Sequence, residues 1–118
     1  MTISRQHTNR RMSQIVVHNG TGYFAGQVAA DDTADVQEQT RSTLAKIDAL
    51  LAQAGTDKTQ LLSATIYLKD IAGHFSLMNE VWEDWVPEDC APARACVQAE
   101  MARATLLVEI SVVAAVGD

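Results

Sequence analysis

Arg94 is the residue of this sequence whose type and surroundings point most clearly to chemistry. It lies in Ala91–Val97, the sequence APARACV, where its neighbours are small or apolar. A guanidinium group cannot lose its charge, and burying it without a partner is costly. Its planar fork can bind a carboxylate through two parallel hydrogen bonds. Arg94 therefore predicts a clamp for an anionic ligand, with a structural salt bridge or an edge-strand arginine that reaches water as the alternatives.

Glu109 is the second candidate, because it is a lone carboxylate within the apolar run Leu106–Ile110. If a two-residue turn at 103–104 joins the last two strands, Arg94 and Cys96 share a sheet face with Glu109. A three-residue loop would instead place Glu109 on the other face. The first register brings a carboxylate and a guanidinium together, which suits either a reaction site or a structural ion pair.

The remaining polar residues give no pattern for a metal, a phosphate or a cysteine nucleophile. Asn19–Gly22 is too short for a phosphate loop and is better explained as a turn. Cys90 and Cys96 lack the pairing and the histidine partners of a zinc site or a nucleophile. We therefore expect no metal site and no phosphate-binding loop. The histidines, expected to be solvated or to cap helices, are His7, His18 and His74.

Composition places the chain among small globular proteins of the reduced cytoplasm. It has 118 residues, a formal net charge of −6 and two cysteines. The acid excess argues against a nucleic-acid partner, and no apolar run approaches the roughly 18–20 residues of a membrane helix. The first residues are basic but lack the apolar region of a secretory signal. We expect one domain over 1–118, with residues 1–11 as a loose arm.

The period of the apolar residues changes along the chain and predicts the order β-β-α-β-α-β-β. The Asn-Gly pair at 19–20 lies between two β-branched runs and predicts a hairpin. Apolar spacings of three and four predict two amphipathic helices, the first of them capped by one of residues 31–33. The elements are expected at 13–18 and 22–28 (strands), 32–54 (helix), 61–68 (strand), 72–86 (helix), and 94–101 and 106–116 (strands joined by a short turn).

One sheet with both helices on the same face is the arrangement that this order predicts. The other face then has no helix to cover it, and its residues on the last strand are mostly small and aliphatic. A monomer of this size leaves a large share of its surface in water. The chain is 47% apolar with only 5% aromatic residues, so its aliphatic surplus predicts that another subunit covers this face.

Two C-terminal segments, Pro92–Val97 and Val108–Ile110, closely resemble the signature of the RidA/YjgF family of enamine/imine deaminases. The similarity extends from Ser13 to Val116 in the expected order. The two tryptophans of the second helix and the short N-terminus resemble a YoaB-like branch of that family. Supporting matches are Phe24–Val28, Leu51–Gly55, Tyr67–Asp70 and Met78–Trp82.

The resemblance implies an α+β, chorismate-mutase-like fold and a homotrimer with clefts between neighbouring subunits. The family's substrates are reactive 2-imino and 2-enamino acids, which water converts to 2-keto acids and ammonia without metal or cofactor. By position, Arg94 would grip the substrate carboxylate, and Glu109 would hold or activate the water. The backbone at Gly26 and Cys96 would contact the substrate. Asn79 matches a polar position near the cleft, with a helix-surface or capping role as the alternative.

Two departures from the family pattern concern the range of substrates. Met12 or Ser13 stands where RidA proteins usually carry a tyrosine, and Tyr23 either replaces that hydroxyl or belongs to the core or an interface. Glu100 stands where a small or basic residue is commoner. The rival hypothesis is a protein that binds a 2-keto acid through Arg94 without catalysis. A regulatory or chaperone-like role has no specific motif to support it.

Overall fold

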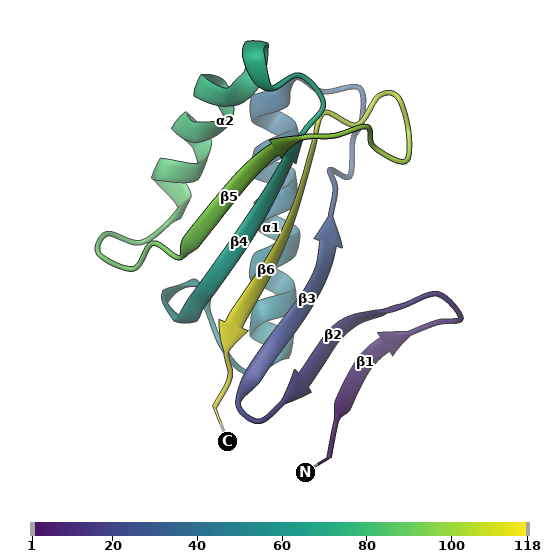
Figure 1. Cartoon of the computed structure of the whole chain (residues 1–118), viewed down its shortest axis with the longest axis vertical. Coiled ribbons are helices and arrows are strands. Elements are labelled where there is room, and N and C mark those ends of the chain that lie inside the picture. The colour runs from purple at the N-terminus through teal and green to yellow at the C-terminus, as the bar shows by residue number, and fades with distance from the viewer. Residues whose placement is uncertain (1, 118) are drawn as a thin grey trace.

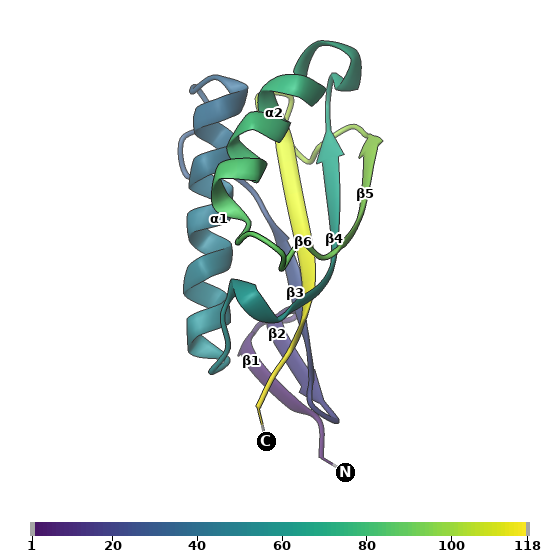
Figure 2. The ribbon, with the colours of Figure 1, turned by 90° about the vertical axis from the view of Figure 1, so that its left-hand side faces the viewer.

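Both helices pack on the same face of one mixed sheet, as predicted (Figures 1 and 2), and this sheet has six strands rather than the five expected. The structure is a computed structural model, and it describes residues 2–117. Across the sheet the strands follow the order β1-β2-β3-β6-β4-β5, and β4 and β5 are the parallel pair. The elements are β1 (Ser4–Thr8), β2 (Ser13–His18), β3 (Thr21–Gln27), α1 (Val36–Gln53), the short 3-10 helix η1 (Lys58–Gln60), β4 (Leu61–Leu68), α2 (Ile71–Trp85), β5 (Ala93–Gln98) and β6 (Val108–Ala115).

Helix α1 begins at a side chain that caps its first amides. Asp35 accepts a hydrogen bond of 2.9 Å from the backbone N–H of Glu38, so the cap predicted at 31–33 is wrong. Asp31 instead closes the preceding turn by accepting from the backbone N–H of Thr33. No helix within residues 2–117 is both long and apolar enough to cross a membrane.

The central strands β4 and β6 divide their side chains between the two faces of the sheet. Ile66 is fully buried beneath the helices, and its partner on β6, Ile110, is fully buried as well. The next pair, Tyr67 and Glu109, is only half-buried and points to the opposite face. The hydrophobic core therefore fills the space between the helices and one face of the sheet.

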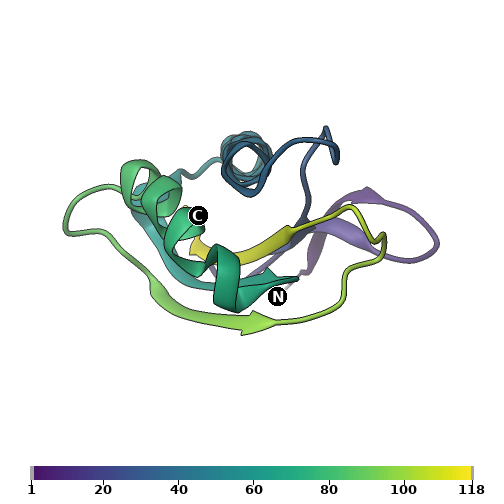
Figure 3. The ribbon, with the colours of Figure 1, turned by 90° about the horizontal axis from the view of Figure 1, so that it is seen from above.

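The second face of the sheet carries neither helix (Figure 3). We name this surface the open face and define it by five of its residues, which are half-buried or exposed. Strand pairing places them on the same side as Glu109. These residues are Tyr23, Thr65, Val97, Ser111 and Val113.

The N-terminal residues belong to the sheet, which corrects the prediction of a loose arm over residues 1–11. Ser4–Thr8 form β1, which pairs antiparallel with β2 so that Arg5 lies opposite Val16. An edge strand hydrogen-bonds along one side only and is exposed along most of its length, so polar residues suit it. The absence of apolar residues hid this strand, because its attachment depends on backbone pairing.

Strands β5 and β6 are not neighbours, which corrects the prediction that a short turn joins them in a hairpin. Strand β4 lies between them, and α2 carries the chain from β4 to β5, so these two strands run parallel. Residues 99–107 then lead from β5 to β6 outside the sheet. In this register Arg94 pairs with the buried Ala64, whereas Glu109 pairs with Tyr67.

Candidate functional site

Arg94 lies on the helix side of the sheet, next to α2. It is the second residue of β5, an edge strand whose partner is β4. Its Nη1 donates a hydrogen bond of 2.7 Å to Oδ1 of Asn79, which lies in the second half of α2. The structure therefore brings two of the residues singled out from the sequence, Arg94 and Asn79, into direct contact.

Two aromatic rings of α2 flank the guanidinium. Cζ of Arg94 lies 5.9 Å from the ring centroid of Phe75 and 5.6 Å from that of Trp82. Contacts of this kind contribute about 0.5–1 kcal/mol each at exposed sites. Together with Asn79, the rings follow the spacing i, i+4, i+7 and share one helix face. From the sequence, Phe75 and Trp82 were recognised only as part of the apolar stripe of this helix. Their spacing on either side of Asn79 is the signal that could have assigned both rings to the site.

The guanidinium of Arg94 has donors left for a ligand. The ion pairs found among residues 2–117 are Arg41–Glu38 and Arg103–Asp32, and neither includes Arg94. A guanidinium has five N–H donors, and the bond to Asn79 uses one. The neighbouring amide and aromatic groups fix its position without neutralising its charge. This combination suits recognition of a carboxylate.

Cys96 follows Arg94 by two positions and lies on the same side of β5, partly buried against the core. Burial raises the pKa of its thiol, and the nearby charge of Arg94 opposes that shift. The raised pKa keeps the sulfur protonated at neutral pH, so it is a poor nucleophile. Cys96 can thus contribute its backbone and its shape, but the structure offers no support for covalent chemistry at its sulfur.

Glu109 lies on the open face against the backbone of Gly26. Strands β3 and β6 shift register between Phe24 and Gln27, and Gly26 falls within this bulge. A Cβ added to Gly26 would lie 3.0 Å from Cδ of Glu109 and would collide with Oε2. Glycine is therefore the residue that leaves room for this carboxylate. Tyr67, which the sequence did not single out for a site role, lies directly opposite Glu109 on β4.

The site residues fall into two groups on opposite faces of the sheet. The predicted register, with Arg94 and Glu109 on one face, is wrong because it assumed that β5 and β6 pair directly. With β4 between them, Arg94 lies on the helix side and Glu109 on the open face. We name these the Arg94 group (Arg94, Asn79, Phe75, Trp82 and Cys96) and the Glu109 group (Glu109 and Gly26).

Tyr23 is not a core residue. It is 51% exposed and lies on the open face opposite Val113 of β6. Met12, which stands near the position of the family's usual tyrosine, is 40% exposed just before β2. A tyrosine hydroxyl is therefore available on the open face, but it comes from β3.

Replacing Gly26 with alanine tests whether the position of Glu109 matters. The added methyl group would displace the Glu109 carboxylate. If the chain hydrolyses 2-imino acids, as the family resemblance implies, we expect the rate of this hydrolysis to fall by about tenfold or more. The free energy of unfolding should change by about 1 kcal/mol or less. Gly117→Ala is the matched control, because a Cβ there meets no atom within 4 Å. Activity assays and thermal unfolding measure the two effects, and equal activity of both variants would contradict the role given to Gly26.

Comparison with known proteins places this arrangement in a family. The sequence profile described as Endoribonuclease L-PSP matches residues 2–116. The RutC family protein YoaB of Escherichia coli K12 is 45% identical over 116 residues, which are 98% of this chain and 100% of YoaB. The chain belongs to the RidA/YjgF family. The resemblance seen in the sequence, including its YoaB-like features, is thereby confirmed.

Solved RidA/YjgF structures share the whole fold. A YjgF-family protein of Neisseria meningitidis superposes with a TM-score of 0.95 at 42% identity, covering 100% of this chain and 98% of its own. A Salmonella typhimurium protein, provisionally described as a translation initiation inhibitor, has a TM-score of 0.88 at 42% identity with 98% of both chains covered. The descriptions given to members of the family thus differ, and they do not name one activity.

Proposed function

We propose that this RidA/YjgF protein hydrolyses reactive 2-imino and 2-enamino acids to 2-keto acids and ammonia. The observation that carries the proposal is the fixed guanidinium of Arg94, held by Asn79 and two aromatic rings yet paired with no carboxylate among residues 2–117. Every substrate of this class has a carboxylate beside the reacting carbon. Two parallel hydrogen bonds from Arg94 would therefore fix the orientation of that carbon.

Glu109 supplies the proton chemistry in this proposal. Its carboxylate accepts a proton from water as the water oxygen bonds to the imine carbon, and the imine nitrogen takes up that proton. In the resulting tetrahedral intermediate the hydroxyl proton moves to the amine nitrogen and the C–N bond breaks, which releases ammonia and yields the 2-keto acid. A 2-enamino acid follows the same path after a proton has moved from its nitrogen to C3, which converts it to the imine. General acid–base catalysis of this kind contributes about 10²–10⁴-fold. Because imine hydrolysis is intrinsically easy, one oriented water and one carboxylate suffice.

A second copy of the chain is needed to unite the two groups. Within one copy, Arg94 and Glu109 lie on opposite faces of the sheet. Arg94 belongs to the edge strand β5, and the open face that carries Glu109 presents the exposed Tyr23 beside small residues such as Ser111 and Val113, which suits an interface. We therefore place each reaction cleft between the Arg94 group of one subunit and the Glu109 group of its neighbour. The resemblance to the RidA/YjgF family implies that these subunits form a homotrimer.

A trapping assay tests the activity. An amino-acid oxidase generates 2-imino acids in the presence of semicarbazide, which converts them to semicarbazones that absorb light. Wild-type protein is expected to suppress semicarbazone formation, because it hydrolyses the imino acid first. If the rate of trapping is unchanged across imino acids with small, branched and aromatic side chains, the proposed reaction is wrong.

Mixed oligomers test the cleft between subunits. Arg94→Ala and Glu109→Gln subunits, unfolded together and refolded at equal ratio, should regain about a quarter of the wild-type activity. The reason is that a random closed ring gives about one cleft in four an intact Arg94 and an intact Glu109 from different subunits. The unmixed variants, refolded in the same way, are the controls. Activity that stays at the level of the unmixed variants would contradict a shared cleft.

Binding without catalysis is the second candidate function, and one observation favours it. The Arg94 group is complete within one chain, whereas the Glu109 group is not brought to it. A protein that only binds a 2-keto acid would need Arg94 and no activated water. Under this alternative the trapping assay shows no turnover, while a 2-keto acid still binds to the wild type and not to Arg94→Ala.

We do not propose ribonuclease activity, despite the description of the matching family profile. The chain has a net charge of −6, whereas affinity for nucleic acids depends largely on neutralised phosphates. Arg94 is one cation beside an amide and two rings, rather than part of a basic surface.

A further inference from the structure

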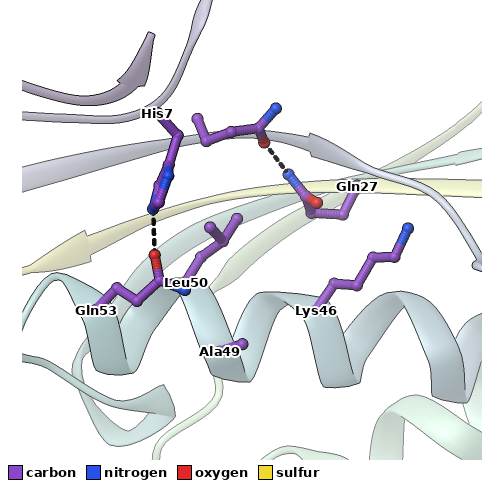
Figure 4. A pocket seen from close by; sticks show the side chains of 7 residues that line it. His7, Gln27, Lys46, Ala49, Leu50 and Gln53 are labelled. Carbon is purple, nitrogen blue, oxygen red and sulfur yellow. Dashed lines mark hydrogen bonds between the residues drawn. The ribbon is translucent and has the colours of Figure 1, made fainter.

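A cavity lies away from both groups of the candidate site, between α1 and the N-terminal strands (Figure 4). Its volume is about 380 Å³. Lys46, Leu50 and Gln53 line it from α1 at the spacing i, i+4, i+7, so one helix face forms one wall. Strands β1, β2 and β3 supply His7, Gln14 and Gln27 on the other side.

The N-terminal strand β1 closes one end of this cavity. Nε2 of His7 is hydrogen-bonded to Oε1 of Gln53 on α1 (Figure 4). The backbone of His7 has a φ of 54°, in the left-handed region that few residues other than glycine adopt. This conformation accompanies a side chain that spans the space between strand and helix.

Hydrogen bonds inside the cavity leave donors without acceptors. Nε2 of Gln27 donates to Oε1 of Gln14 at 2.7 Å and to the carbonyl oxygen of Ala25 at 3.0 Å. Gln14 and Gln53 each form a hydrogen bond through Oε1, and their amide N–H groups have no acceptor among residues 2–117. The ammonium of Lys46 has neither an ion pair nor a hydrogen bond within the same residues.

The charge of the lining selects for an anion. Within a chain of net charge −6, the residues that line this cavity include Lys46 and no aspartate or glutamate. Two amide N–H groups and one ammonium are the donors that a carboxylate needs for its two oxygens. Leu50 and Ala49 add an apolar patch that fits a short alkyl chain. We propose that this cavity is a binding site for a small aliphatic carboxylate, independent of the Arg94 group.

NMR titration of the full-length protein with butyrate tests this site. We expect saturable shifts of the side-chain amide signals of Gln14 and Gln53. Lys46→Met should weaken binding by about tenfold or more, because a charge-assisted hydrogen bond is lost. Lys58→Met, which removes a lysine that lies over Trp85 outside the cavity, should leave the affinity unchanged.

Three further measurements distinguish this carboxylate site from the Arg94 group, from a purely apolar pocket and from a phosphate site. Butyramide has the shape of butyrate without its charge and should bind at least tenfold more weakly. Arg94→Ala should leave the shifts of Gln14 and Gln53 intact, since it removes only the candidate reaction site. Loss of these shifts in Arg94→Ala, or an affinity for butyrate that Lys46→Met leaves unchanged, would overturn the proposal. Inorganic phosphate that displaces butyrate at equal or lower concentration would also overturn it, because the cavity would then be a phosphate site.

Discussion

Arg94→Ala is expected to lower the hydrolysis of 2-imino acids by about a hundredfold or more. The loss of the guanidinium removes the two hydrogen bonds that orient the substrate, and misplacement of reacting groups by about 1 Å can cost about 10²-fold. Arg94→Lys should recover only part of this loss, because an ammonium lacks the planar fork and stacks less well between Phe75 and Trp82. The initial rate of semicarbazone formation measures all three proteins.

The matched control for this prediction is Arg41→Ala. Arg41 is also a charged arginine near a helix, but it forms an exposed ion pair with Glu38 on α1 and touches neither group of the site. Exposed pairs of this kind contribute about 0–1 kcal/mol, so the control should fold and react like the wild type. Circular dichroism and thermal unfolding check that each variant keeps its fold. If Arg94→Ala is as active as Arg41→Ala, Arg94 does not hold the substrate.

Glu109→Gln is expected to separate binding from turnover. The amide has the size of the carboxylate and can keep the same place beside Gly26, but it cannot accept the proton of the attacking water. Turnover should therefore fall by about 10²–10⁴-fold, which is the usual range for a lost general base. The affinity for a 2-keto acid should remain within about twofold of that of the wild type. An NMR titration that follows the Nε–H signal of Arg94 measures this affinity.

Glu38→Gln is the control for this variant, because it removes a carboxylate from an exposed ion pair on α1. Its turnover should equal that of the wild type. Full turnover in Glu109→Gln would show that water attacks without this carboxylate. Loss of 2-keto acid binding in Glu109→Gln would instead give Glu109 a role in holding the ligand.

Elements with strong local signals were predictable from the sequence. The first expected strand and the strand over 61–68 have the predicted bounds, because β-branched residues and turn residues mark them within a few positions. Both helices were also predicted, since their apolar spacing depends on neighbours three and four positions away. The family resemblance also rested on short motifs of neighbouring residues, and the match to the family profile confirms it.

The relations between distant strands were not predictable in this way. Nothing near Arg94 or Glu109 indicates that β4 separates their strands, and this insertion puts them on different faces. Strand β1 was not predicted, because it pairs with β2 through backbone groups and has no apolar side chains that would mark it as a strand. The aromatic rings beside Arg94 were visible as residues, but their contact with it depends on how α2 crosses the sheet.

The separation of the two groups along the chain has a consequence for how the protein folds. Asn79 and Arg94 are 15 positions apart in the α2–β5 unit, whereas Gly26 and Glu109 meet only after β6 has inserted between β3 and β4. Closing a longer loop costs more entropy, so contacts close in sequence form earlier. During synthesis, the segment that surrounds Arg94 leaves the ribosome before β6 does. The Arg94 group is therefore expected to assemble first, and the Glu109 group forms only when β6, the last strand, joins the sheet.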